Sequence, residues 1–118
     1  MKLKEIIKVA RLEEKTNNKH SILYQVFEKD ICIYVGIGGK GKSKGSRRLS
    51  EHYNTPTSSF KVQYFNDKWD KGFTRLEAQN MWDQLEWDII QFNTIEEADI
   101  LETKLIKQYN PHFNKDKK

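Results

Sequence analysis

Apolar residues recur at helical spacing at the start of the chain, at positions 3, 6, 7 and 10, and predict a helix over residues 2–15. Asn17-Asn18 is expected to end it. Two segments rich in β-branched and aromatic residues follow, residues 20–28 and 31–36. Because only a short polar segment separates them, they are predicted to pair as a β-hairpin.

The segment from Ile37 to Gly45 contains four glycines and is predicted to be irregular. Ser46 can cap a helix that runs to about Asn54, where Thr55-Pro56 stops it. Residues 58–69 fit two kinds of secondary structure. Phe60, Val62 and Tyr64 alternate as in a strand, yet the segment also fits a helix that ends at Gly72. The helix is favoured.

Two pairs of residues in the second half form the sequence pattern of a capping box, Thr74 with Glu77 and Thr94 with Glu97. Each is expected to begin a helix, and the second helix should run to about Tyr109. Residues 86–92 between them predict a third strand. The chain is therefore expected to be an α+β domain with a small sheet.

Glu102 falls within the apolar stripe of the last predicted helix. With Ala98 placed at zero and about 100° per residue, the apolar side chains from Ile95 to Tyr109 span roughly −60° to +80°, and Glu102 lies near +40°. A carboxylate on such a face needs a partner. It can pair with a buried arginine, escape at the edge of the stripe, or hold a hard divalent cation, which often takes only one or two carboxylates.

Arg48 and His52 are four residues apart, so their side chains share one face of the predicted helix. Leu49 and Tyr53 form the adjacent apolar edge that is expected to hold this helix on the sheet. The planar fork of an arginine suits phosphate oxygens, and a histidine can relay a proton near neutral pH. Taken alone, such a pair is more often two ordinary solvent-exposed polar residues.

Positive charge is concentrated in the first half of the chain. Residues 1–59 contain twelve Lys and Arg against six Asp and Glu, whereas residues 60–118 contain nine against eleven. The densest group has no acid among its members, which are Lys40, Lys42, Lys44, Arg47 and Arg48. This segment indicates either a contact with a polyanion such as nucleic acid or a solvated loop.

Several classes of protein are excluded or disfavoured. The single Cys32 rules out a disulfide framework and a multi-cysteine zinc site. The glycine-rich loop from Gly36 to Lys42 lacks the Gly-Lys-Ser/Thr of a phosphate-binding Walker motif and completes no dinucleotide fingerprint. No signal peptide or bilayer-spanning segment is evident, so a cytoplasmic protein is expected.

Taken together, these residues resemble the GIY-YIG nuclease family over about residues 20 to 114. Ile22-Leu23-Tyr24 and Tyr34-Val35-Gly36 are similar to its two strand motifs, without the usual glycine in the first. The pair Arg48 and His52 is similar to the family's helical arginine and histidine. Glu102, in an Ala…Leu-Glu…Leu-Ile pattern, and Asn114, after Pro111, are similar to its glutamate and asparagine.

The resemblance implies a three-stranded antiparallel sheet flanked by helices and the hydrolysis of DNA phosphodiester bonds. It implies that Tyr24 helps to activate water, that Tyr34 and His52 support the proton transfer, and that Arg48 neutralises the phosphate. Glu102 would hold one Mg²⁺ or Mn²⁺ ion per site. Asn114 would orient the phosphate or the tyrosine. Lys40, Lys42, Lys44 and Arg47 are expected to contact the DNA backbone.

The domain organisation expected from this resemblance has three parts. Residues 1–19 form a helical extension, residues 20–114 the nuclease domain with an insertion at about 55–84, and residues 115–118 a basic tail. A monomer or a transient homodimer on DNA is expected, in a bacterial or phage-infected cell. Phage, mobile-element, restriction and anti-restriction roles stay open, as do a structure-specific repair nuclease and a non-cleaving binding module of the same fold.

Overall fold

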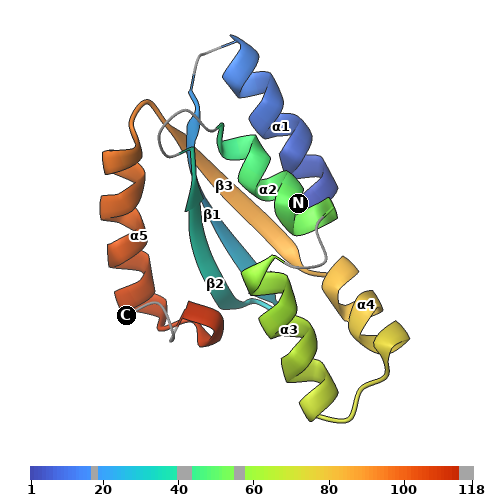
Figure 1. Cartoon of the computed structure of the whole chain (residues 1–118). Coiled ribbons are helices and arrows are strands. Elements are labelled where there is room, and N and C mark those ends of the chain that lie inside the picture. Colours follow the sequence, from blue (N-terminus) through green and yellow to red (C-terminus); the bar gives the residue numbers. More distant parts are fainter. Residues whose placement is uncertain (17–18, 40–43, 55–57, 115–118) are drawn as a thin grey trace.

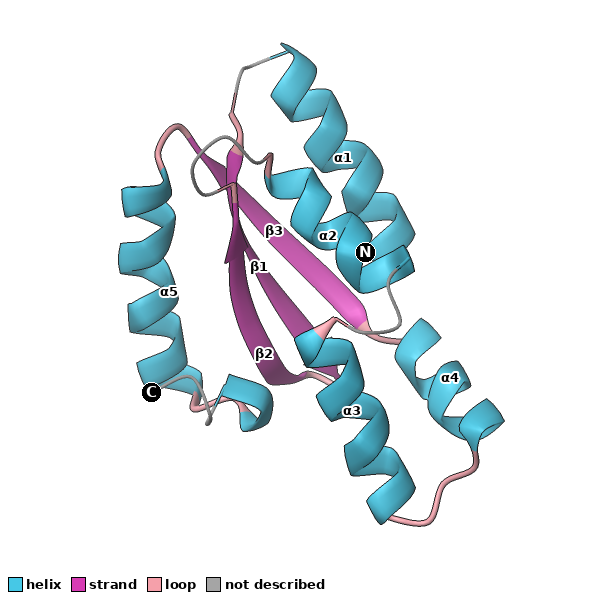
Figure 2. Cartoon of the chain, viewed as in Figure 1, coloured by secondary structure: helices cyan, strands magenta, loops and turns pink. Residues whose placement is uncertain are grey.

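The computed structural model describes residues 1–16, 19–39, 44–54 and 58–114 (Figures 1 and 2). The expected ends of the first and second helices at Asn17-Asn18 and Thr55-Pro56, the lysines Lys40 and Lys42, and the tail 115–118 lie outside these residues. In chain order the elements are α1 (Leu3–Thr16), β1 (Ser21–Glu28), β2 (Ile31–Gly38), α2 (Gly45–Asn54), α3 (Ser59–Asp70), α4 (Arg75–Asp83), β3 (Glu86–Phe92), α5 (Ile95–Tyr109) and the short 3-10 helix η1 (His112–Asn114).

The three strands form one antiparallel sheet in the order β2-β1-β3, which confirms the predicted sheet flanked by helices. Tyr24, in the central strand, lies between Gly36 of β2 and Ile89 of β3. Strand β2 is two residues longer than predicted, because Ile37 and Gly38 continue the pairing with β1 instead of starting an irregular loop.

A bulge in β2 places two consecutive side chains on the same face of the sheet. The register passes from Val26 paired with Tyr34 to Phe27 paired with Cys32, so Ile33 is the additional residue. A bulge interrupts the alternation of side chains along a strand. Both Ile33 and Tyr34 therefore reach the larger hydrophobic cluster, while Cys32 packs in the smaller one.

Helices cover both faces of the sheet (Figure 1). Side chains of α1, α2, α3 and α4 pack with Tyr24, Tyr34 and Trp87 in the larger cluster. On the other face, α5 packs against Leu23 and Val35 in the smaller cluster. The backbone of Met1 also bonds to β3, because the amide of Trp87 donates to the Met1 carbonyl at 2.7 Å and the amino terminus donates to the Trp87 carbonyl at 3.2 Å.

The segment expected to be an insertion contributes to the main core. This segment is helical, as favoured, over residues 59–70, and Phe60 of α3 stacks on Tyr34 with ring centroids 4.3 Å apart and an angle of 8° between the planes. Phe60 is 1 % exposed and also contacts Trp82 of α4. Helices α3 and α4 therefore hold the sheet's buried tyrosine in place.

The N-terminus of α2 differs from the prediction. Ser46 lies inside the helix, which begins at Gly45. The cap comes instead from Glu14 of α1, whose carboxylate accepts the Ser46 backbone N–H at 2.9 Å and its hydroxyl at 2.6 Å. A carboxylate at this end of a helix satisfies backbone donors and matches the helix dipole.

Two tyrosines predicted to pack on the sheet are partly exposed instead. Tyr53 of α2 is 46 % exposed and Tyr109 of α5 is 45 % exposed, so Leu49, not Tyr53, anchors α2. Of the two predicted capping boxes, that of Thr74 and Glu77 is complete. At Thr94 the hydroxyl accepts the Glu97 N–H, and the Glu97 carboxylate accepts from that hydroxyl instead of from the backbone.

Among the described helices none is both long and apolar enough to cross a membrane.

The cap between α1 and α2 can be tested by substitution. Glu14→Ala is expected to lower the free energy of unfolding by about 1–2 kcal/mol, because the helix loses its cap and the buried Ser46 loses its acceptor. Urea denaturation measures the change. Glu14→Gln, which keeps one acceptor oxygen, should lose less, and Lys8→Ala on the exposed face of α1 serves as the control. Equal stability of Glu14→Ala and the control would contradict the cap.

Candidate active site

The hydroxyl of Tyr24 forms a short hydrogen bond with a histidine in the core. Its oxygen lies 2.6 Å from Nε2 of His52, and both residues are fully buried. Tyr24 reaches this point from the central strand, and His52 reaches it from the last turn of α2. Because an unpaired buried hydroxyl is unfavourable, this bond ties α2 to the sheet at a defined position.

The second ring nitrogen of His52 is also held. Nδ1 lies 2.8 Å from Oγ of Ser58, the residue that caps α3 and accepts the backbone N–H of Lys61. If Nδ1 carries the proton and donates it to Ser58, Nε2 is an acceptor for the Tyr24 hydroxyl. Ser58 does not stand out in the sequence, and nothing in the sequence connects it to His52.

Gly36 makes room for the Tyr24 ring. A Cβ atom at Gly36 would lie 2.4 Å from the Tyr24 oxygen and 2.5 Å from the carbon that carries it. No side chain can occupy that space while Tyr24 stays where it is. The glycine of the Tyr34-Val35-Gly36 motif is therefore required by the close approach of Tyr24 from the neighbouring strand.

Tyr34 and Arg48 complete the group around Tyr24. The rings of Tyr24 and Tyr34 have centroids 6.0 Å apart. Burial raises the pKa of the Tyr24 phenol well above its usual range, the neighbouring Tyr34 raises it further, and the Arg48 guanidinium opposes both. Burial acts to lower the pKa of Arg48, but attraction by Tyr24 and Tyr34 outweighs this and the pKa is raised. The guanidinium is therefore a permanent positive charge beside a neutral phenol.

Arg48 also borders an open groove. Its side chain is 34 % exposed and lies 3.6 Å from a carboxylate oxygen of Glu51. The groove, a cavity of about 180 Å³, is lined by Ile37, Gly38, Gly39, Lys44, Arg47, Arg48 and Glu51. Lys44 and Arg47, both predicted to contact DNA, are exposed at this groove.

Asn114 is fixed to the backbone of β2. Its side-chain oxygen accepts the Val35 N–H, and its side-chain nitrogen donates to the Val35 carbonyl, both at 2.8 Å. Asn114 is 3 % exposed. Val35 lies between Tyr34 and Gly36, so this pair of bonds holds the strand segment that faces Tyr24.

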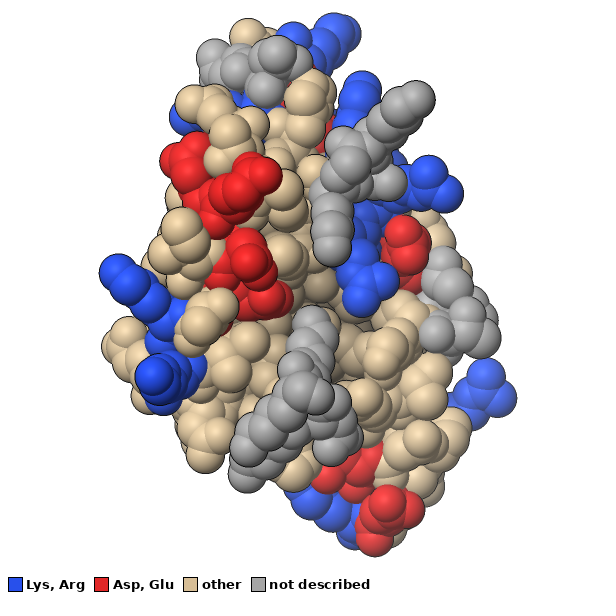
Figure 3. Space-filling view, turned by 60° about the vertical axis from the view of Figure 1, so that its left-hand side comes forward, with Lys and Arg blue, Asp and Glu red and all other residues tan. Residues whose placement is uncertain are grey.

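Glu102 lies on α5, on the other face of the sheet from α2. It is half-buried, next to Leu101, which packs in the smaller cluster, and α5 contacts β2. Figure 3, which turns the side of α5 forward, shows acidic side chains gathered at the upper left, with basic side chains below them and also, across uncharged surface, to their right. Other acidic residues exposed on α5 are Glu96, Glu97 and Asp99.

The structure thus brings Tyr24, Tyr34, Arg48 and His52 into one cluster and fixes Asn114 to the strand that carries Tyr34. Such a cluster can move a proton from the phenol to the imidazole and can neutralise an anion beside the phenol. Within the described residues, no three His, Cys, Asp or Glu side chains lie close enough together to hold a metal ion.

No protein-family model matches this sequence, and no curated protein matches it. Solved structures do resemble it, among them the GIY-YIG N-terminal endonuclease domain of UvrC from Thermotoga maritima. A tyrosine point mutant of that domain, bound to its catalytic divalent cation, has a TM-score of 0.59 and 23 % identity over 95 % of this chain and 93 % of that chain. The form bound to magnesium has a TM-score of 0.54 and 24 % identity over 91 % of this chain and 97 % of that chain. This chain therefore has the fold of the GIY-YIG endonuclease domain.

Proposed function

We propose that this protein is an endonuclease that hydrolyses DNA phosphodiester bonds with one divalent metal ion. The observation that carries the proposal is the buried hydrogen bond between Tyr24 and His52, with Arg48 beside it at an open groove. The solved structures of the same fold support it, because they are described as endonuclease domains bound to a catalytic divalent cation.

The spacing of the tyrosines gives further support. In three of those structures a tyrosine has been replaced by phenylalanine, and two of the three substituted positions are ten residues apart. Tyr24 and Tyr34 are separated by the same number of residues, on paired strands. An asparagine is substituted in another of those structures, which is consistent with a role for Asn114.

In the proposed reaction, Tyr24 takes part in activating the attacking water and His52 takes the proton. The raised pKa of Tyr24 means that the phenol is neutral at neutral pH and does not act as a free phenolate. Its proton must therefore leave as the reaction proceeds, and Nε2 of His52 is the acceptor at 2.6 Å. Ser58 keeps His52 in the ring orientation that leaves Nε2 available.

Arg48 has two roles in this proposal. Without DNA, its guanidinium interacts with the Tyr24 hydroxyl. A phosphodiester in the groove offers oxygens that suit the planar fork of an arginine better than a neutral phenol does. Arg48 would then move toward the phosphate, neutralise its developing charge and uncover the Tyr24 oxygen for the attacking water.

Glu102 is the proposed ligand of the metal ion. A half-buried carboxylate on α5, with no cluster of three potential ligands among the described residues, suits Mg²⁺ or Mn²⁺ and not a zinc cage. When bound, such an ion stabilises the leaving oxygen as a Lewis acid. Asn114 is proposed as a positioning residue, because both of its bonds are to the strand between Tyr34 and Gly36.

We further propose that Lys44 and Arg47, together with Lys40 and Lys42, contact the DNA backbone. Flexible cations position a duplex and do not read its bases. One metal site per domain favours one strand cut per encounter by a monomer, and cutting of both strands would need a homodimer that forms transiently on DNA or a second encounter. Nicking of supercoiled plasmid with Mg²⁺, and none with EDTA, is the direct test of the function.

The metal ligand is tested by Glu102→Ala, which should abolish plasmid nicking and leave DNA binding largely intact. The reason is that the carboxylate is the proposed protein ligand of the metal, whereas binding depends on the basic groove. Asp99→Ala, one turn earlier on α5 and exposed, is the control and should nick normally. Normal nicking by Glu102→Ala at saturating Mg²⁺ would remove Glu102 from the site.

The role of Arg48 is tested against its neighbour. Arg48→Ala should slow nicking about 10²- to 10³-fold, as the loss of one donor to a developing oxyanion does. Arg48→Lys should recover little, because an ammonium lacks the fork. Arg47→Ala should weaken DNA binding more than single-turnover cleavage. A larger loss of cleavage with Arg47 than with Arg48 would contradict the assigned roles.

The close approach at Gly36 makes a separate prediction. Gly36→Ala should lower the free energy of unfolding by about 1–3 kcal/mol, because the added methyl overlaps the Tyr24 ring, and nicking should fall further than stability explains. Gly72→Ala is the control: its φ of +90° makes alanine strained, but nothing lies within 4 Å. Urea denaturation and plasmid nicking are compared between the two variants. Full nicking activity in Gly36→Ala would show that the reaction does not require Tyr24 in this position.

A further inference from the structure

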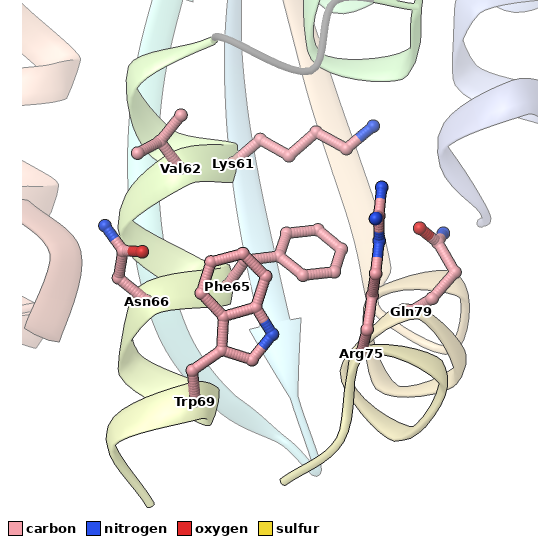
Figure 4. Close-up of a pocket in the computed structure, with 7 residues that line it drawn as sticks. All are labelled: Lys61, Val62, Phe65, Asn66, Trp69, Arg75 and Gln79. Atoms are coloured by element: carbon pink, nitrogen blue, oxygen red, sulfur yellow. The ribbon is translucent and has the colours of Figure 1, made fainter.

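A second cavity, of about 200 Å³, lies between α3 and α4 (Figure 4). It is smaller than the roughly 300–1,000 Å³ of sites for drug-sized ligands, so it suits a group the size of one planar ring. Its lining combines two aromatic rings, two cations and two amides. No carboxylate is among the residues that line it.

Two aromatic rings of α3 line one side of the cavity, one packed on the core and one exposed to solvent. Phe65 is half-buried, and its ring lies 6.0 Å from those of Tyr64 and Trp82, so the core fixes it. Trp69, one turn later on α3, has its ring centroid 6.1 Å from Phe65 and is 49 % exposed. In Figure 4 the two rings lie together on the α3 side, facing Arg75 and Gln79 of α4.

The charged groups lie around these rings. Lys61 Nζ is 5.5 Å from the centroid of Trp82 and 3.4 Å from the Tyr53 carbonyl. Burial lowers the pKa of Lys61, although Asp83 opposes the shift. Arg75 is exposed on the opposite wall, and in Figure 4 its side chain points toward Lys61. Both cations line the same cavity, and two positive charges there favour an anion between them.

We propose that this cavity binds an unpaired base of a DNA strand, with the adjacent phosphate between Lys61 and Arg75. A base can stack on Trp69 because every base has a π-face, and stacking on exposed aromatic rings is the usual way in which proteins hold single strands. The amides of Asn66 and Gln79 carry both donors and acceptors for the edge of a base. A base inside a duplex cannot enter, so the cavity selects DNA with an unpaired segment.

The placement on α3 supports this assignment, which rests on the proposed nuclease function. The first turn of α3 carries Phe60, stacked on Tyr34 at the candidate active site. From Phe60 to Trp69 the helix rises roughly 14 Å at 1.5 Å per residue, so the cavity lies at the far end of α3 from the core of the candidate site. An unpaired base in the cavity would therefore define where cleavage occurs relative to a flap, bulge or single-stranded end.

The test is equilibrium binding of a fluorescently labelled oligothymidylate, measured by anisotropy in EDTA so that no strand is cut. Trp69→Ala should weaken binding about 5- to 150-fold, the range for loss of one base–aromatic stack. Trp69→Phe should keep most of the affinity, because it keeps a ring. Leu76→Ala, an exposed apolar residue on α4 that does not line the cavity, is the matched control and should bind normally.

A second readout is independent of folding defects in the variants. Trp82 and Trp87 are buried and Trp69 is exposed, so stacking of a base should quench the fluorescence of Trp69 in the unmodified protein. Trp69→Phe should lose this quenching while it still binds the oligonucleotide. Arg75→Gln, at an exposed position, should weaken binding and reduce its salt dependence.

The outcomes separate this proposal from the nuclease proposal. If Trp69→Ala and Leu76→Ala bind oligothymidylate equally, or if the unmodified protein shows no quenching, the cavity is not a base site, whether or not plasmid is nicked. If plasmid is never nicked but the Trp69 variants show the expected losses, the base site stands and the protein is a binding module. A larger effect of Trp69→Ala on the single strand than on a blunt duplex of equal length is the expected result.

Discussion

The buried hydroxyl of Tyr24 constrains much of this structure. It lies at the centre of a three-stranded sheet, where an oxygen without a partner would be strongly unfavourable. The fold satisfies it with His52, and this requires α2 to lie across the sheet at one position and in one rotation. The same ring leaves space for nothing larger than glycine at position 36 on the adjacent strand. One polar atom thus specifies the placement of a helix and the identity of a residue on another strand.

The support for this arrangement comes from helices that are distant in sequence. Ser58 orients His52, and Phe60 stacks on Tyr34, so the first turn of α3 contacts both partners of Tyr24. Glu14 of α1 caps α2 from its other end. The contacts that preorganise the cluster also form the main hydrophobic core. Stability and the proposed chemistry depend on the same residues.

The sequence predicted the elements well and their packing less well. Periodicity located all three strands and the long helices, because a repeat of hydrophobic residues reports directly which face of an element is buried. It also placed Arg48 and His52 on one side of a helix. Local patterns could not reveal the cap that Glu14 gives to Ser46 or the bond from Ser58 to His52, because each joins residues that only the tertiary fold brings together.

The sequence pattern also failed to predict how exposed some side chains are. Tyr53 and Tyr109 extend the apolar stripes of their helices, yet the sheet is narrow and neither is covered. Periodicity assigns a residue to a face but does not report how far the opposing surface extends. The same limit applies to Glu102, which the helical arc placed among apolar neighbours and the structure leaves half-buried on α5.

The two bonds from Asn114 to Val35 have a consequence beyond the candidate site. Strand β2 is an edge of the sheet, and an edge presents unpaired amides and carbonyls that can recruit a strand from another molecule. The Asn114 amide offers one donor and one acceptor in the way a neighbouring strand would. At the opposite edge, the backbone of Met1 forms hydrogen bonds with both the N–H and the carbonyl of Trp87 in β3. Each edge of the three-stranded sheet is thus occupied at one residue by a peptide-like group, which blocks the pairing of another strand at that residue.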